Sequence, residues 1–130
     1  MSPVTMAFRR LPAATVVWVS GEVDVTNSAQ LGTFLADVHP RPQEPLLLEL
    51  SGLSFLDCSG LCVLIDARDQ VQAAGGGVHV VSPHPRVLRL LEITGLGRVV
   101  SLHPDLPRAL QAVNPHTAAT ATDVTAGLGA

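Results

Sequence analysis

The sequence predicts an α/β fold: a single domain with a small, mixed and mostly parallel sheet of about four or five strands and about four helices. Short apolar runs rich in β-branched residues alternate along the chain with segments whose apolar residues recur at helical spacing. The run Leu46–Leu50 is apolar enough for a strand buried on both faces, as strands of parallel sheets are. A length of 130 residues is enough for one domain with a modest core and not for two.

The N-terminal segment is predicted to form a hairpin. Residues 4–11 read as a short edge strand, and residues 14–20 are rich in β-branched side chains and read as a second strand. Pro12 in the connection stays outside the ladder. Gly21 is expected to end the second strand, which leaves residues 22–24 in a loop at its carboxyl end.

The rest of the chain alternates helices and strands. Polar residues at 26–28 can cap a helix that Pro40 ends, and Val25 is expected to join its apolar face. Ile93 is likewise expected to face the core. The other predicted elements are a helix from Leu61 ended by Gly75-Gly76-Gly77, a strand at 78–81, a helix at 86–93 closed by Gly95, a strand at 98–102 and a helix from Pro104 or Leu106 to about Val113.

The C-terminal segment differs from the rest in composition. Residues 114–130 contain mainly Ala, Thr and Gly and have no periodic apolar pattern. Such a segment cannot bury enough apolar surface to offset the entropy of ordering it. We therefore expect a domain at residues 1–113 and a disordered tail at 114–130.

Composition excludes several classes of function. The net charge is −3 with 8 Lys and Arg residues and no basic stripe, which argues against direct binding of nucleic acid. No apolar run is long enough to span a membrane, and no signal peptide is recognisable, so we expect a cytoplasmic protein with reduced cysteines. The five histidines show no ligand spacing, so neither a metal site nor a cofactor is expected.

The stretch Leu53–Leu61 is the most informative part of the sequence. It follows an apolar strand, precedes an apolar helix and places Asp57, Cys58, Ser59 and Gly60 in a row. That order is typical of a turn leading into a helix N-terminus, where free backbone N–H groups favour oxygen acceptors and anions. The residues alone leave two interpretations open: a well-capped helix, or a hydroxyl group offered to a kinase.

Two further acids are expected near this junction. Glu22 and Asp24 follow the second predicted strand, and Asp57 follows the run at Leu46–Leu50. In open α/β sheets, ligand and partner surfaces gather at the carboxyl ends of the strands. The sequence therefore predicts that these two motifs meet at one edge of the molecule.

Three motifs in register resemble the STAS domain family, and most closely its stand-alone bacterial members, the anti-anti-sigma factors (anti-sigma factor antagonists). The resemblance covers roughly residues 6–112. The motifs are Gly21-Glu22-Val23-Asp24, Asp57-Cys58-Ser59-Gly60-Leu61 and Ile93-Thr94-Gly95-Leu96. The resemblance implies a non-enzymatic protein, a monomer or weak dimer, that binds an anti-sigma factor with a kinase-like ATPase domain and so frees a sigma factor. It also implies that Glu22, Asp24, Asp57, Cys58, Ser59 and Gly60 form the partner-binding surface.

One residue departs from the family pattern. Regulated members are phosphorylated on the hydroxyl residue directly after the motif aspartate, and here that position is Cys58. The switch is therefore absent, moved to Ser59 as the phosphorylation candidate, or replaced by thiol chemistry at Cys58. Asp57 either caps the helix or positions a bound kinase. Cys62 is expected to lie in the core.

The sequence leaves two rival functions open. The first is an orphan STAS interaction module of a larger sensory or regulatory complex, without a phospho-switch. The second is a thiol enzyme that uses Cys58, and it is disfavoured because no base can be placed beside the thiol. We therefore expect no catalytic activity.

Overall fold

The computed structural model describes residues 3–41 and 43–113, and its described strands form one sheet of six. The order is β1-β2-β3-β5-β6, with β4 paired to β2 off this path. β1 is antiparallel to β2, and all other pairs are parallel. The strands are β1 (Thr5–Arg10), β2 (Thr15–Val23), β3 (Leu46–Glu49), β4 (Leu53–Leu56), β5 (Val78–Val81) and β6 (Ser101–His103).

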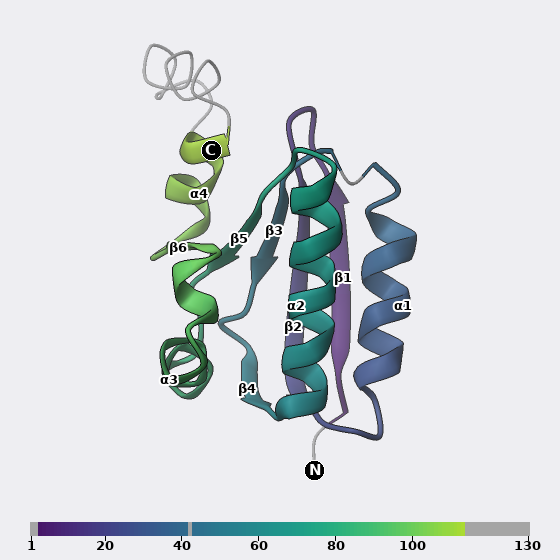
Figure 1. Ribbon diagram of the computed structural model, residues 1–130, viewed down its shortest axis with the longest axis vertical. Coiled ribbons are helices and arrows are strands. Elements are labelled where there is room, and N and C mark those ends of the chain that lie inside the picture. Colours follow the sequence, from purple (N-terminus) through teal and green to yellow (C-terminus); the bar gives the residue numbers. More distant parts are fainter. Residues whose placement is uncertain (1–2, 42, 114–130) are drawn as a thin grey trace.

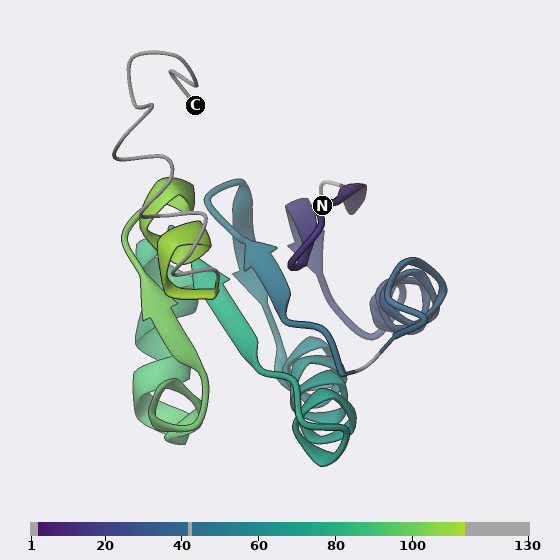
Figure 2. The same ribbon diagram turned by 90° about the horizontal axis from the view of Figure 1, so that it is seen from above.

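Helices cover both faces of this sheet, as Figures 1 and 2 show. The helices α1 (Ser28–Val38), α2 (Cys58–Ala73) and α3 (Pro85–Thr94) contribute buried side chains to the larger core cluster. The helix α4 (Leu106–Val113) covers the other face, where Ala109 packs with Val16, Leu47 and Val81. The predicted fold class is thus confirmed.

The strand β4 is the element that the sequence did not predict. The sequence predicts a turn in this stretch, yet Leu53 and Leu56 are buried and pair with the end of β2. β4 raises the number of strands above the expected four or five. Its pattern of buried positions does not alternate, so it lacks the two-residue period by which strands are recognised.

The expected end of β2 at Gly21 is wrong, because the strand continues to Val23 through a bulge at Gly21 and Glu22. Gly21 has φ +97°, and a Cβ there would lie 2.0 Å from the carbonyl oxygen of Pro3. Only glycine fits at this position, because the bulge needs a positive φ there and a side chain would clash with Pro3. The bulge carries the strand on, so that its last residues can pair with β4.

Several predicted helix boundaries are confirmed. Gly75 after α2 and Gly95 after α3 both adopt positive φ, as left-handed helix ends require. The core predictions for two residues are wrong: the exposed fractions of Val25 and Ile93 are 77% and 71%. The strand predicted at 98–102 is found at Ser101–His103, and its expected start is occupied by a turn of 3₁₀ helix at Leu96–Arg98.

The predicted tail at 114–130 lies outside the described residues. Within residues 3–41 and 43–113, no helix has both the length and the apolar character needed to cross a bilayer.

Candidate functional site

The two predicted motifs meet where β2 and β4 end side by side. Val23 of β2 is in register with Leu56 of β4, and the Asp57 N–H donates to the carbonyl of Val23 at 3.2 Å. In Figure 1 this region is the lower end of the molecule, where β4 passes into the first turn of α2 and β2 leads toward α1. The expectation that both motifs share one edge is confirmed by this contact.

Asp57 caps α2. Its carboxylate accepts from the Ser59 N–H at 2.9 Å and the Gly60 N–H at 3.2 Å, and it also accepts from the Ser59 hydroxyl. The Ser59 hydroxyl is the main cause of a lowered Asp57 pKa, to which the backbone N–H groups of Gly60, Ser59 and Val25 add. The Val25 contribution ties the carboxylate to the loop after β2. Asp57 is therefore ionised at neutral pH and joins the two segments.

The loop between β2 and α1 is held by its own polar side chains. The Asp24 carboxylate accepts from the Thr26 N–H at 2.8 Å and from the Thr26 hydroxyl. Asn27 occupies the N-cap position of α1, but its side chain makes no cap bond. Instead it accepts from the Asp24 N–H and donates to the carbonyl of Glu22, both at 2.9 Å. The loop thus has a defined shape before any partner arrives.

The three residues after Asp57 differ in their access to solvent. Cys58 is exposed, Ser59 is half-buried and Gly60 is buried. Consequently Cys58 can touch a partner directly, whereas Gly60 can act only through its backbone. The expectation that Cys62 lies in the core is wrong: it is a free, exposed thiol one turn after Cys58 on α2.

Other polar groups lie away from this site. Among residues 3–41 and 43–113, no three His, Cys, Asp or Glu side chains are grouped so as to hold a metal ion. The fold does bring His79 and His103 together, with Nδ1 of His79 3.0 Å from Nε2 of His103. The two histidines are 24 residues apart in the chain, so the sequence pattern did not predict that they lie together.

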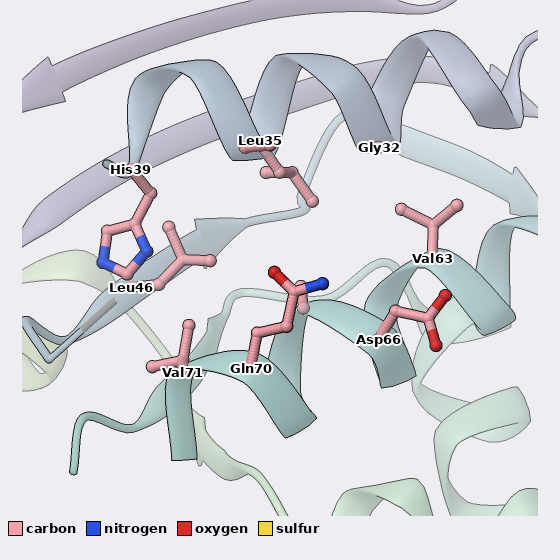
Figure 3. Close-up of a pocket in the computed structure, with 10 residues that line it drawn as sticks. Gly32, Leu35, His39, Leu46, Val63, Asp66, Gln70 and Val71 are labelled. Atoms are coloured by element: carbon pink, nitrogen blue, oxygen red, sulfur yellow. The ribbon is translucent and has the colours of Figure 1, made fainter. Parts of the chain in front are cut away.

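A cavity of about 190 Å³ lies between α1 and α2 (Figure 3). Leu35 and His39 line it from the α1 side, and Val63 and Gln70 line it from α2. These α2 residues come one to three turns after Ser59, so the cavity is distinct from the edge at which Asp57 lies. Sequence reasoning gave no signal for it.

Replacing Asp57 with asparagine should change the free energy of unfolding by less than about 1 kcal/mol, because the amide keeps an acceptor oxygen for the cap. Urea denaturation of the variant checks this expectation. If Asp57 also belongs to the partner surface, the folded variant should bind its partner more weakly. Unchanged binding would leave Asp57 with the capping role alone.

Comparison with known proteins defines the class. The STAS domain family model matches residues 5–109. The chain therefore belongs to the STAS domain family.

Its relatives within that family are regulators. The anti-sigma-F factor antagonist RsfA of Mycobacterium tuberculosis is 32% identical over 103 residues, which cover 77% of this chain and 80% of that protein. The crystal structure of an anti-sigma factor antagonist from Mycobacterium paratuberculosis has a TM-score of 0.72 at 30% identity and covers 86% of this chain and 95% of its own. The Bacillus cell fate determinant SpoIIAA in its phosphorylated form shares the fold, with a TM-score of 0.67 at 18% identity over 84% of this chain and 99% of its own.

Proposed function

We propose that this protein is an anti-sigma factor antagonist. It binds an anti-sigma factor of the kinase-like ATPase type and thereby releases a sigma factor by mass action, because the anti-sigma factor engaged by one partner is withdrawn from the other. It acts in the cytoplasm, as a monomer or weak dimer, and without catalysis of its own. The names of its relatives support the regulatory part of this proposal.

The observation that carries the proposal is the joined edge around Asp57. The carboxylate fixes the start of α2, and the β2–α1 loop is braced beside it by Asp24 and Asn27. Two apolar side chains, those of Val25 and Cys58, are exposed there. A pre-shaped surface with exposed apolar groups and a polar surround suits a protein partner.

A phosphate on Ser59 would act on this surface as a switch. It would add about two negative charges beside the ionised Asp57 carboxylate and break the hydrogen bond that Ser59 donates to it. The positive end of the α2 dipole would offset part of that repulsion inside the domain, but not at an interface. The phosphorylated form of SpoIIAA is a precedent for such a modification within the fold.

A second function is favoured by a specific observation. The exposed residue at the family's phosphoserine position is Cys58, while the Ser59 hydroxyl is half-buried and engaged by Asp57. Both facts argue against a phospho-switch, as expected for a STAS interaction module that works without one. The two functions differ in the partner that they require and in their response to charge at Ser59.

Affinity capture from the native host separates them, with the wild type and Ser59→Glu as paired baits. The proposal predicts that the wild type retrieves an ATPase-type anti-sigma factor and that Ser59→Glu loses it. Gln72→Glu is the matched control, because it adds the same charge at an exposed position near the other end of α2 and should retrieve the partner normally.

Two other results of the affinity capture also separate the two functions. Retrieval by both the wild type and Ser59→Glu keeps the antagonist function and removes the switch from Ser59. Failure of the wild type to retrieve any anti-sigma factor contradicts the antagonist proposal and favours the interaction module. Circular dichroism of each bait beforehand ensures that lost binding is not lost folding.

A further inference from the structure

His79 and His103 form an imidazole pair on neighbouring strands. Nδ1 of His79 lies 3.0 Å from Nε2 of His103, and the ring planes are inclined by 27° with centroids 5.2 Å apart. No other contact between histidine side chains occurs in the part of the chain that the structure describes. The pair is remote from Asp57 in the sequence and belongs to strands that the proposed partner surface does not use.

The strand register places both rings on one face of the sheet. His79 of β5 is in register with Ser101 of β6, and Val81 is in register with His103. Alternate residues of a strand share a face, so the face of Val81 also carries both histidines. That face is the one covered by α4, because Val81 packs with Ala109. The two paired strands therefore hold the backbone positions of His79 and His103 close together on one face.

Both rings lie in surroundings that disfavour their charged form. Burial lowers the pKa of both imidazoles, and the proximity of His103 lowers that of His79 further. Asp105 opposes this shift at His103, but its effect is the smaller one. Burial thus disfavours the charged form of both rings, and it is the neutral imidazole that offers an unprotonated nitrogen as a ligand.

We propose that Nδ1 of His79 and Nε2 of His103 together bind one divalent transition-metal cation, with water in its remaining coordination positions. Two nitrogens about 3 Å apart match adjacent positions around an ion whose metal–nitrogen bonds are about 2.0–2.1 Å. Imidazole with water suits Ni²⁺, Cu²⁺ and Zn²⁺, whereas Mg²⁺ and Ca²⁺ prefer oxygen. Nothing in the proposed function requires this site.

Binding changes the proton arrangement without changing the charge of the pair. In the observed hydrogen bond, one of the two facing nitrogens carries a proton. That ring must shift to its other tautomer, and both rings must turn about their side-chain torsions so that the two lone pairs converge on the ion. No proton is released from the neutral pair. The Asp105 carboxylate is not counted among the ligands, because it accepts from the Arg108 N–H at 2.9 Å and caps α4.

The bound ion would link β5 to β6, the strand that leads into α4. An ion that binds only the folded chain stabilises it in proportion to the logarithm of the ion concentration above Kd. The site should therefore be visible both as binding and as thermal stabilisation. With only two protein ligands, the ion exchanges readily with solvent.

Calorimetric titration of the full chain with Ni²⁺ at pH 7 tests the proposal, in a Cys58→Ser/Cys62→Ser background that removes competing thiols. We expect one ion bound per chain and a melting temperature that rises with Ni²⁺. Both effects should disappear in His79→Gln and in His103→Gln. His84→Asn is the matched control, because the observed pair consists of His79 and His103 and asparagine preserves an acceptor for the start of α3.

Paramagnetic broadening of the NMR signals of the same background by Ni²⁺ locates the ion without any substitution at a histidine. The proposal requires the broadening to centre on the rings of His79 and His103. Absence of saturable binding, or broadening centred on another histidine, would overturn it and leave the pair as a simple hydrogen bond. None of these outcomes bears on anti-sigma factor binding. The proposed metal site can therefore be disproved without disproving the proposed function, and the reverse.

Discussion

Replacing Leu64 with alanine is expected to lower the free energy of unfolding by about 2–5 kcal/mol, because it removes a large side chain from the core. Leu64 lies on the inner face of α2 and is 3% exposed. It belongs to the core cluster that joins α2 to the sheet, together with Leu61 and Val71. The cost has two parts: the lost transfer of the side chain out of water, and the cavity left between α2 and the strands.

Urea denaturation followed by far-UV circular dichroism measures this effect. Cys62→Ala is the matched control, because Cys62 is exposed on the same helix two residues earlier and its loss should change the free energy of unfolding by only about 0.5 kcal/mol or less. Equal effects of the two substitutions would mean that α2 does not present Leu64 to the core, and the packing described above would then be wrong.

Gly60→Ala should lower the free energy of unfolding by about 1–3 kcal/mol through overpacking. A Cβ at Gly60 would lie 2.3 Å from Cδ1 of Leu56 and 2.7 Å from Cγ1 of Val23. Both neighbours are buried at the point where β2, β4 and α2 meet, so neither can move without disturbing the core. The gain of helix propensity from glycine to alanine, about 1 kcal/mol, offsets only part of the strain.

Gly32→Ala provides the comparison, because Gly32 is also a helical glycine and lies beside the cavity between α1 and α2. A Cβ there would lie 3.7 Å from the nearest methyl of Val63, an ordinary contact. We therefore expect Gly32→Ala to stabilise the protein by about 0.5–1 kcal/mol. A stabilising Gly60→Ala would contradict the close approach of α2 to the ends of β2 and β4.

Local features of the fold could be predicted because neighbouring residues determine them. The Asp57 cap follows from an acid directly before an apolar helix, and the left-handed ends at Gly75 and Gly95 follow from glycine after the last helical turn. β4 could not be predicted in this way. Its pairing with the end of β2 depends on the bulge at Gly21, some thirty residues earlier in the chain.

The same distinction applies to the candidate site. The tendency of partner surfaces to gather at the carboxyl ends of strands predicted that the segments after β2 and before α2 share an edge, although the contact is made through the unpredicted β4. Solvent exposure was harder to predict, because it depends on how a helix is rotated about its axis relative to the sheet. Cys62 and Ile93 have apolar character but face outward. The contact between His79 and His103 arises from the register of β5 and β6, which the sequence pattern does not encode.

The central claim is that this domain frees a sigma factor by binding its anti-sigma factor. The most direct measurement is a titration of the purified domain into a purified complex of a host anti-sigma factor with a fluorescently labelled sigma factor, followed by anisotropy. The account predicts that anisotropy falls to the value of the free sigma factor as the domain saturates its partner. An unchanged anisotropy, with every anti-sigma factor of the host tested, would contradict it.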